Sequence, residues 1–309
     1  MEQSTFDDLF MQEPSGPMQQ GQPEFDKDAW VAKKQEQRET LFAHVEQMAD
    51  ATLSDPAALQ RFLQKQGAAV HSYSVTNMLL ILKQRPDKSD HVRHEDEWTE
   101  LGRGIRKGEG RNAILLFRQD HEFAGKDGFM KSGYNVHRYF DISQTYGPAM
   151  QKQEQPNIRT LLSALMAKTA VQVTLSESVN KEVGAIYVQQ ENIIHVAPGM
   201  EGGHLFRVVS RELARVEHGG GNSPADTWFA SCISNIVGAR YGIAPTPIES
   251  IPGDIATADP RTKKALLESI NQPAQDTIRK METMLQPYRR AQRESRSGQQ
   301  QPQQSQPSR

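Results

Sequence analysis

Three stretches in the first half of the chain carry apolar residues at helical spacing. Residues 26–48 place apolar side chains among many Lys, Gln and Glu residues, which predicts a long amphipathic helix. Asp55 and Pro56 have the residue types of the N-cap and the first position of a second helix. A shorter and more apolar helix covers residues 75–82 and stops before Pro86. These helices supply a candidate core for the N-terminal half.

Strand patterns follow these helices. The continuous apolar run AILLF at residues 113–117 predicts a buried strand, and residues 134–142 predict a second one. The segment between them, residues 119–133, is polar and contains glycine, so we expect an exposed hairpin loop. Lys126 and Lys131 would lie near its tip and extend any basic surface nearby.

The second half of the chain alternates helical patterns with short strand patterns. Residues 184–200 contain two β-branched runs that flank a polar triplet, which is a hairpin signal. The other elements expected here are a strand at 171–175, helices at 158–168, 205–218 and 227–241, and a helical pattern within 251–293. Gly242 follows the third of these helices, as a helix-terminating glycine does.

The patterns predict an α+β chain of two small domains, a helix-plus-sheet domain and then a mainly helical domain with a β-hairpin. The N-terminal end is rich in Gln, Pro, Gly and Met, and Gln, Pro and Ser dominate the C-terminal end, which predicts disordered termini. The expected divisions are a tail at 1–25, a first domain at 26–148, a linker at 149–156, a second domain at 157–245, a helical extension at 246–293 and a tail at 294–309.

Composition narrows the class of protein. The 309 residues are 24% charged and 36% hydrophobic, as in ordinary globular proteins, and no apolar run is long enough to span a membrane. The N-terminus lacks a secretory pattern, so we expect a cytoplasmic protein. A single cysteine, Cys232, excludes an intramolecular disulfide and a cysteine-rich zinc site. A net charge of -2 argues against electrostatic capture of nucleic acid by the whole surface, so any such contact is local.

A basic, glycine-rich turn immediately precedes the strand at 113–117. Its cations are Arg103, Arg106, Lys107 and Arg111. Glu109 is the one acidic residue between Leu101 and Phe117. Glycines let backbone N–H groups approach a ligand, and Arg and Lys donate charge-assisted hydrogen bonds to phosphate oxygens. The turn therefore suits phosphate binding, and the competing interpretation is a solvated hairpin turn.

Two aromatic residues near this turn also have two interpretations. Trp98 and Tyr73 have rings on which unpaired bases can stack, as single-strand binding requires. A Trp in a short helix is also a common core residue. The residue types alone do not choose between these roles.

Four motifs carry a resemblance to a known family. They are YSVTNMLLILKQRP at 73–86, WTELGRGIRKGE at 98–109, AILLF at 113–117 and RYFDISQT at 138–145. In this order and spacing they resemble the N-terminal domain of ArdC-type antirestriction proteins, over about residues 30–147. The resemblance implies an α+β domain that binds single-stranded DNA without strong sequence preference, in proteins usually encoded by plasmids and integrative elements.

The same resemblance singles out candidate residues. The candidates for the DNA-binding surface or its support are Tyr73, Asn77, Trp98, Arg103, Arg106 and Lys107. Arg111 joins them as part of the basic turn.

The second half resembles a minimal zincin, the domain that usually follows in ArdC-type proteins. In a zincin, one helix presents two histidines four residues apart to zinc, a glutamate next to the first is the general base, and the following helix adds a carboxylate. The corresponding pentad is Arg211-Glu212-Leu213-Ala214-Arg215. Guanidinium groups have no lone pair to donate, so both expected ligands are missing.

The position of the third zincin ligand, a carboxylate on the following helix, also lacks a good metal ligand. Counting back from Gly242, the carboxylate ligand falls at Ser231. We expect Glu212 to pair with Arg207, Arg211 or Arg215 instead of activating a water. An alternative metal site would combine Glu212 with dispersed histidines, which are His195, His204 and His218. Our main prediction is a domain with no metal, no cofactor and no catalytic residues.

The predicted function is single-stranded DNA binding by a mobile-element protein with an antirestriction or transfer-related role and an inactive metallopeptidase-like domain. One alternative is an active zinc metallopeptidase with unrecognised ligands. Another is a protein-interaction scaffold, and the second domain has a possible protein partner in either case. No membrane partner is expected, and the sequence sets no oligomeric state.

Overall fold

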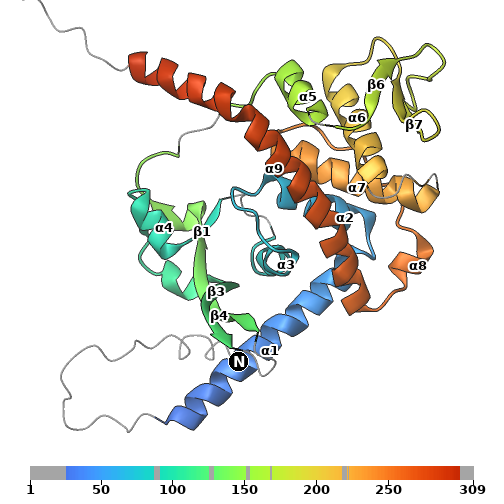
Figure 1. The fold of residues 1–309 in the computed structure, drawn as a ribbon. Coiled ribbons are helices and arrows are strands. Elements are labelled where there is room, and N and C mark those ends of the chain that lie inside the picture. The colour runs from blue at the N-terminus through green and yellow to red at the C-terminus, as the bar shows by residue number, and fades with distance from the viewer. Residues whose placement is uncertain are drawn as a thin grey trace, which may run out of the picture. The chain divides into compact units, whose positions relative to one another are not determined.

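The computed structural model describes residues 26–86, 91–124, 129–150, 154–167, 169–217, 221 and 223–299. The chain divides into two compact units, each formed from separate stretches (Figure 1). Unit 1 comprises Met1–Phe62, Ala69–Gln151 and Gly253–Ala265, and unit 2 comprises Leu63–Ala68, Lys152–Pro252 and Leu266–Arg309. The predicted α+β class is confirmed. The predicted tail at residues 1–25 lies outside the described residues.

Local capping signals start the helices of unit 1. Helix α1 spans Lys27–Thr52, and the side chain of Asp26 accepts hydrogen bonds from the first N–H groups. Helix α2 spans Pro56–Ala68 and is capped by Asp55, as the sequence predicts. Helix α3 spans Val75–Gln84, begins after the N-cap Ser74 and packs against α1. These contacts bury the apolar faces that the sequence pattern indicates.

The sheet of unit 1 is antiparallel, with strand order β1-β4-β3. Its strands are β1 (Val92–His94), β3 (Ile114–Ala124) and β4 (Met130–Asp141). The loop expected over 119–133 is wrong in extent, because β3 and β4 continue pairing up to Ala124 and Met130. Lys131 therefore lies exposed on a strand, and Lys126 lies outside the described residues. The short remaining elements of unit 1 are α4 (Glu95–Glu100), β2 (Gly104–Ile105), η2 (Glu109–Asn112), η3 (Ile142–Gln144), β5 (Thr145–Tyr146) and α8 (Gly253–Ala256).

Two amide side chains of α3 cover the outer edge of β3. The side chain of Asn77 donates to the carbonyl oxygen of Phe117 at 2.8 Å and accepts from its N–H at 3.0 Å. Gln84 makes the same pair of bonds with Leu115, at 3.1 and 2.9 Å. Residues 115 and 117 both direct their backbone groups away from β4, so the two amides take the place of a neighbouring strand. An edge strand left bare would be a template for pairing with another chain.

Unit 2 contains a three-stranded sheet and helices packed on it. Strands β6 (Gln172–Leu175) and β8 (Ile193–Val196) pair in parallel, and β7 (Ala185–Val188) pairs antiparallel with β8. The predicted strand and hairpin are thereby confirmed. Helix α6 (Gly202–Glu217) packs against α5 (Ile158–Met166), α7 (Pro224–Arg240) and β7.

Helix α9 runs from Pro260 to Gln299 and contributes to both units. It continues past 293, into the segment expected to be a disordered tail, and residues 300–309 lie outside the described part of the chain. Near its start, buried Lys263 donates to Asp50 at 2.6 Å and to Ser54 at 2.9 Å within unit 1. Across the described helices, none combines the length and apolar character needed to cross a bilayer.

The amide contacts between α3 and β3 give the first prediction. Replacing Asn77 with Ala leaves the N–H and carbonyl of Phe117 without these partners, and should lower the free energy of unfolding by about 1–3 kcal/mol. The measurement is urea denaturation followed by circular dichroism. Gln35→Ala is the matched control, because Gln35 is exposed on α1 and donates to the side chain of Glu39, so its loss should cost at most about 0.5 kcal/mol. Equal stability of the two variants would contradict the role of Asn77.

Candidate nucleic-acid interface

The basic turn joins α4 to β3 and is held by backbone hydrogen bonds to η3 and β5, which follow β4 in the chain. Gly102 and Gly108 have φ values of 70° and 91°, which favour glycine. Strand β2 pairs with β5, and the N–H of Arg106 donates to the carbonyl of Gln144 at 2.9 Å. Residues 104–106 of the turn are therefore fixed to residues 144–146.

Arg103 is the buried anchor of this turn. Its side chain is 9% exposed, its Nε donates to the hydroxyl of buried Thr145 at 2.9 Å, and its Nη1 donates to the carbonyl of Pro148. Its guanidinium also lies 5.8 Å from the centre of the Trp98 ring. Arg103 supports the turn from inside and offers little surface to a ligand.

Arg106, Lys107 and Arg111 are the exposed cations of the turn. The Nε of Arg106 donates to the carbonyl of Thr145 at 3.0 Å, which holds its guanidinium along β5. Within the described residues its terminal nitrogens form no hydrogen bond or ion pair, and the same holds for the ammonium of Lys107. Arg106, Lys107 and Arg111 are together called the exposed cations.

The one acidic residue of the turn is engaged by its own neighbours. Hydrogen bonds to the Glu109 carboxylate come from Gln144 at 2.9 Å and Asn112 at 3.3 Å. The bond from Gln144 is the main cause that lowers the pKa of Glu109, with further contributions from Asn112, Arg85 and Arg106. Glu109 thus stays ionised but binds inward, and the outer side of the turn is positively charged.

The other sequence-predicted residues are interior. Trp98 is fully buried and donates from Nε1 to the carbonyl of Phe140 at 2.9 Å. Tyr73 is 8% exposed and its hydroxyl donates to the carbonyl of Val92, while burial raises the pKa of that hydroxyl. Asn77 covers the edge of β3. Trp98 and Tyr73 are therefore core residues and do not offer their rings to bases. Together with Asn77 they stabilise the fold of unit 1.

The sequence did not single out Tyr146, which directly follows Thr145, the residue whose carbonyl accepts from Arg106. It is 61% exposed and sits on β5, directly opposite Gly104 of β2. The pairing brings together residues that are far apart in the chain, and strands of two residues have no periodicity to reveal them. The one signal in the sequence is an aromatic residue directly after the motif RYFDISQT.

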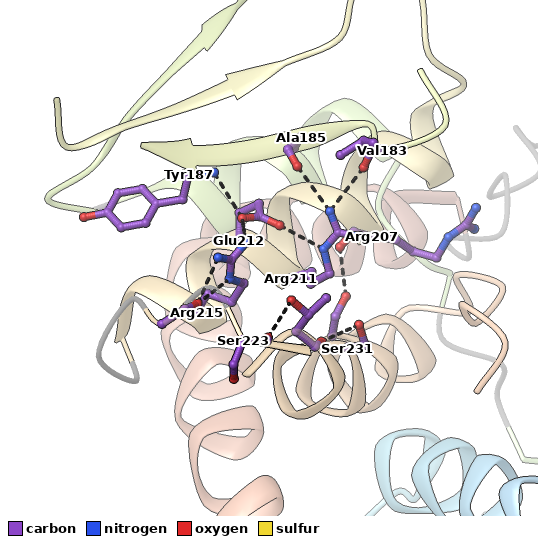
Figure 2. Close-up of polar contacts among 12 residues, drawn as sticks. Val183, Ala185, Tyr187, Arg207, Arg211, Glu212, Arg215, Ser223 and Ser231 are labelled. Atoms are coloured by element: carbon purple, nitrogen blue, oxygen red, sulfur yellow. Dashed lines mark hydrogen bonds and ion pairs between the residues drawn. The ribbon is translucent and has the colours of Figure 1, made fainter. Parts of the chain in front are cut away.

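In unit 2 the pentad forms a buried ionic cluster around Glu212 (Figure 2). The carboxylate is 0% exposed and accepts from Arg211 Nε at 2.9 Å, Arg215 Nη1 at 2.8 Å and the N–H of Tyr187 at 3.1 Å. Both oxygens are engaged, so the predicted network of Glu212 with arginines is confirmed for Arg211 and Arg215. Arg207 instead donates to the carbonyl of Ala244 at 3.1 Å.

The two guanidinium groups also bind backbone carbonyls. Arg211 donates from Nη2 to Val183 and Ala185, both at 3.2 Å, as Figure 2 shows. Arg215 donates to the carbonyl of Gly221 from Nε at 3.1 Å and Nη2 at 2.9 Å. The cluster therefore joins α6 to the start of β7 and to the segment before α7.

The possible alternative metal ligands do not gather around this cluster. His195 contacts Glu191 at 3.0 Å and Thr174 at 3.3 Å through its two ring nitrogens. The hydroxyl of Ser231 donates to the carbonyl of Thr227 at 2.7 Å. His218 lies outside the described residues, and among those described no three His, Cys, Asp or Glu side chains are grouped to hold a metal ion. His204 belongs to no such group either.

Comparison with solved structures finds the same fold in two crystal structures of the antirestriction protein ArdC from plasmid R388. The metal-free form matches with a TM-score of 0.51 and 14% sequence identity, over 78% of this chain and 97% of that one. The Mn(II)-bound form matches with a TM-score of 0.52 and 12% identity, over 78% and 98%. No protein-family model and no curated protein matches the chain. At this identity the likeness establishes an ArdC-like fold.

The ionic cluster gives the second prediction. Glu212→Gln removes the charge that compensates two largely buried guanidinium groups, and should lower the free energy of unfolding of unit 2 by about 3–5 kcal/mol. Urea denaturation is the measurement. The triple variant Arg211→Met, Glu212→Leu, Arg215→Met is the control, because apolar replacement of a whole buried ionic group is often neutral or stabilising. A triple variant less stable than Glu212→Gln would contradict this account.

Proposed function

We propose that the chain is a single-stranded-DNA-binding protein of the ArdC antirestriction kind. It is encoded on a plasmid or another mobile element, acts in the cytoplasm, and contacts DNA through the exposed cations of the basic turn. The observation that carries this proposal is that Arg106, Lys107 and Arg111 are solvent-exposed on a glycine turn anchored by Arg103, within an ArdC-like fold.

Charge supports a local contact with a single strand. A net charge of -2 argues against electrostatic capture of DNA by the surface as a whole, so the contact is expected to be local. Three cations on one short turn match a few consecutive phosphates, and the flexible backbone of a single strand can follow such a turn. Binding through so few phosphates is expected to be moderate in affinity and sensitive to salt.

Unit 2 is proposed to be a metallopeptidase-like domain without peptidase chemistry. One of the two ArdC crystal structures holds Mn(II), which raises the question of whether the pentad of this chain fits a metal. It does not, because arginines flank Glu212 and both oxygens of its carboxylate accept hydrogen bonds. On this proposal the buried carboxylate serves to hold unit 2 together and does not act as a catalytic base.

The third prediction tests DNA binding. The protein should bind a fluorescent dT oligonucleotide more tightly than a duplex of the same length in fluorescence anisotropy at low salt. Arg106→Ala with Lys107→Ala should weaken this binding and reduce the slope of log K against log salt by about 1.4, because two phosphate contacts are lost. Arg103 is left intact, since its burial makes a loss of folding hard to separate from a loss of binding.

A matched double variant controls for net charge. Lys34→Ala with Arg61→Ala removes two exposed cations from α1 and α2 and should leave both the affinity and the slope near those of the wild type. Absence of single-strand binding by the wild type would overturn the proposed function. Equal effects of the two double variants would show that the turn is not the contact site.

The fourth prediction concerns metal. Protein dialysed against buffer containing Zn²⁺ or Mn²⁺ and then desalted should hold far less than one equivalent by elemental analysis. Neither ion should raise the Tm, because an ion that bound the folded state would stabilise it. One equivalent with a higher Tm would support the metallopeptidase alternative, and its loss in His204→Ala would locate the ligands.

A further inference from the structure

Tyr146 has the geometry of a platform with one open face. A methyl group placed on Gly104 would lie 2.7 Å from both Cζ and the hydroxyl oxygen of Tyr146 and 2.8 Å from Cε1. Atoms of the ring therefore lie directly over the bare backbone of Gly104, on the inner face of the ring. The residue is nevertheless 61% exposed, so a large part of it remains accessible to solvent.

The backbone beneath this ring is fixed. Thr145, the residue before Tyr146, is buried and binds Arg103 through its hydroxyl and Arg106 through its carbonyl. Gly147 follows with a φ of 138°, and a methyl group there would lie 2.9 Å from the carbonyl oxygen of Gly102. The ring is thus presented from a rigid support, which reduces the entropy lost when a flat ligand packs on it.

The positively charged guanidinium of Arg106 is held one residue away from Tyr146. The guanidinium of Arg106 is bound to the carbonyl of Thr145, one residue from the platform, and Lys107 follows it on the same turn. A nucleotide offers the complementary pair of groups, a flat base and a phosphate within the same unit. Stacking tolerates any base, because every base has a π face.

We propose that an unpaired base of single-stranded DNA stacks on Tyr146 while an adjacent phosphate binds Arg106 or Lys107. This inference rests on the proposed function and adds a residue that distinguishes single-stranded from duplex DNA. In a duplex the base faces are covered by their neighbours, so the platform contributes affinity only to unpaired nucleotides. Trp98 and Tyr73 are buried in the core and cannot stack on a base, whereas Tyr146 is exposed and can.

The test compares Tyr146→Ala with Tyr146→Phe, using a fluorescent dT oligonucleotide and a strand of equal length built from abasic sites. The alanine variant should bind dT roughly 5- to 100-fold more weakly than the wild type, with an unchanged salt slope. The phenylalanine variant keeps the ring and should bind within about twofold of the wild type. On the abasic strand, wild type and alanine variant should bind equally.

Gly104→Ala provides a second route to the same contact. Its added methyl group would displace the ring without removing it, so binding of dT should fall while Tyr146 is still present. Wild-type binding of dT with no loss in Tyr146→Ala would overturn the stacking role and leave the proposed function standing. An equal loss on the abasic strand would also overturn it, since no base is present there. No binding by the wild type would overturn both.

Discussion

A buried guanidinium group is costly unless its N–H groups find acceptors, and both units of this chain are organised by meeting that requirement. In unit 1, Arg103 binds Thr145 and Pro148 and lies over the ring of Trp98. In unit 2, Arg211 and Arg215 share Glu212 and extend to backbone carbonyls on either side. A single guanidinium in unit 1, and two that share one carboxylate in unit 2, therefore join segments of the chain that are separated in sequence.

This requirement separates buried supporting residues from exposed residues within a single motif. Arg103 and Arg106 are three positions apart in the same basic turn, and the sequence gives no reason to treat them differently. The structure commits the N–H groups of Arg103 to interior acceptors and leaves the ends of the Arg106 guanidinium in solvent. A phosphate can therefore be bound at the exposed position without unfolding the turn that carries it.

The sequence predicts the locally encoded features and misses those that depend on distant partners. The cap at Asp55, the hairpin of unit 2 and the pairing of Glu212 with arginines follow from residue type and spacing. The outer part of β3 and β4 has a loop-like pattern because most of its side chains are exposed on both faces, so it lacks the apolar alternation of a half-buried strand. The partners of Gly104 and Trp98 lie about forty residues away, and neither Tyr146 nor the burial of Trp98 is visible in a local pattern.

The cluster around Glu212 meets the charge and hydrogen-bonding needs of its members from within unit 2. Both oxygens of the carboxylate accept hydrogen bonds, and Arg211 and Arg215 supply the compensating positive charge. A single histidine in place of Arg211 or Arg215 would leave the other guanidinium beside Glu212 and would not complete a ligand set. A metal site at this pentad would therefore require several changes at once, whereas the present cluster is satisfied as it stands.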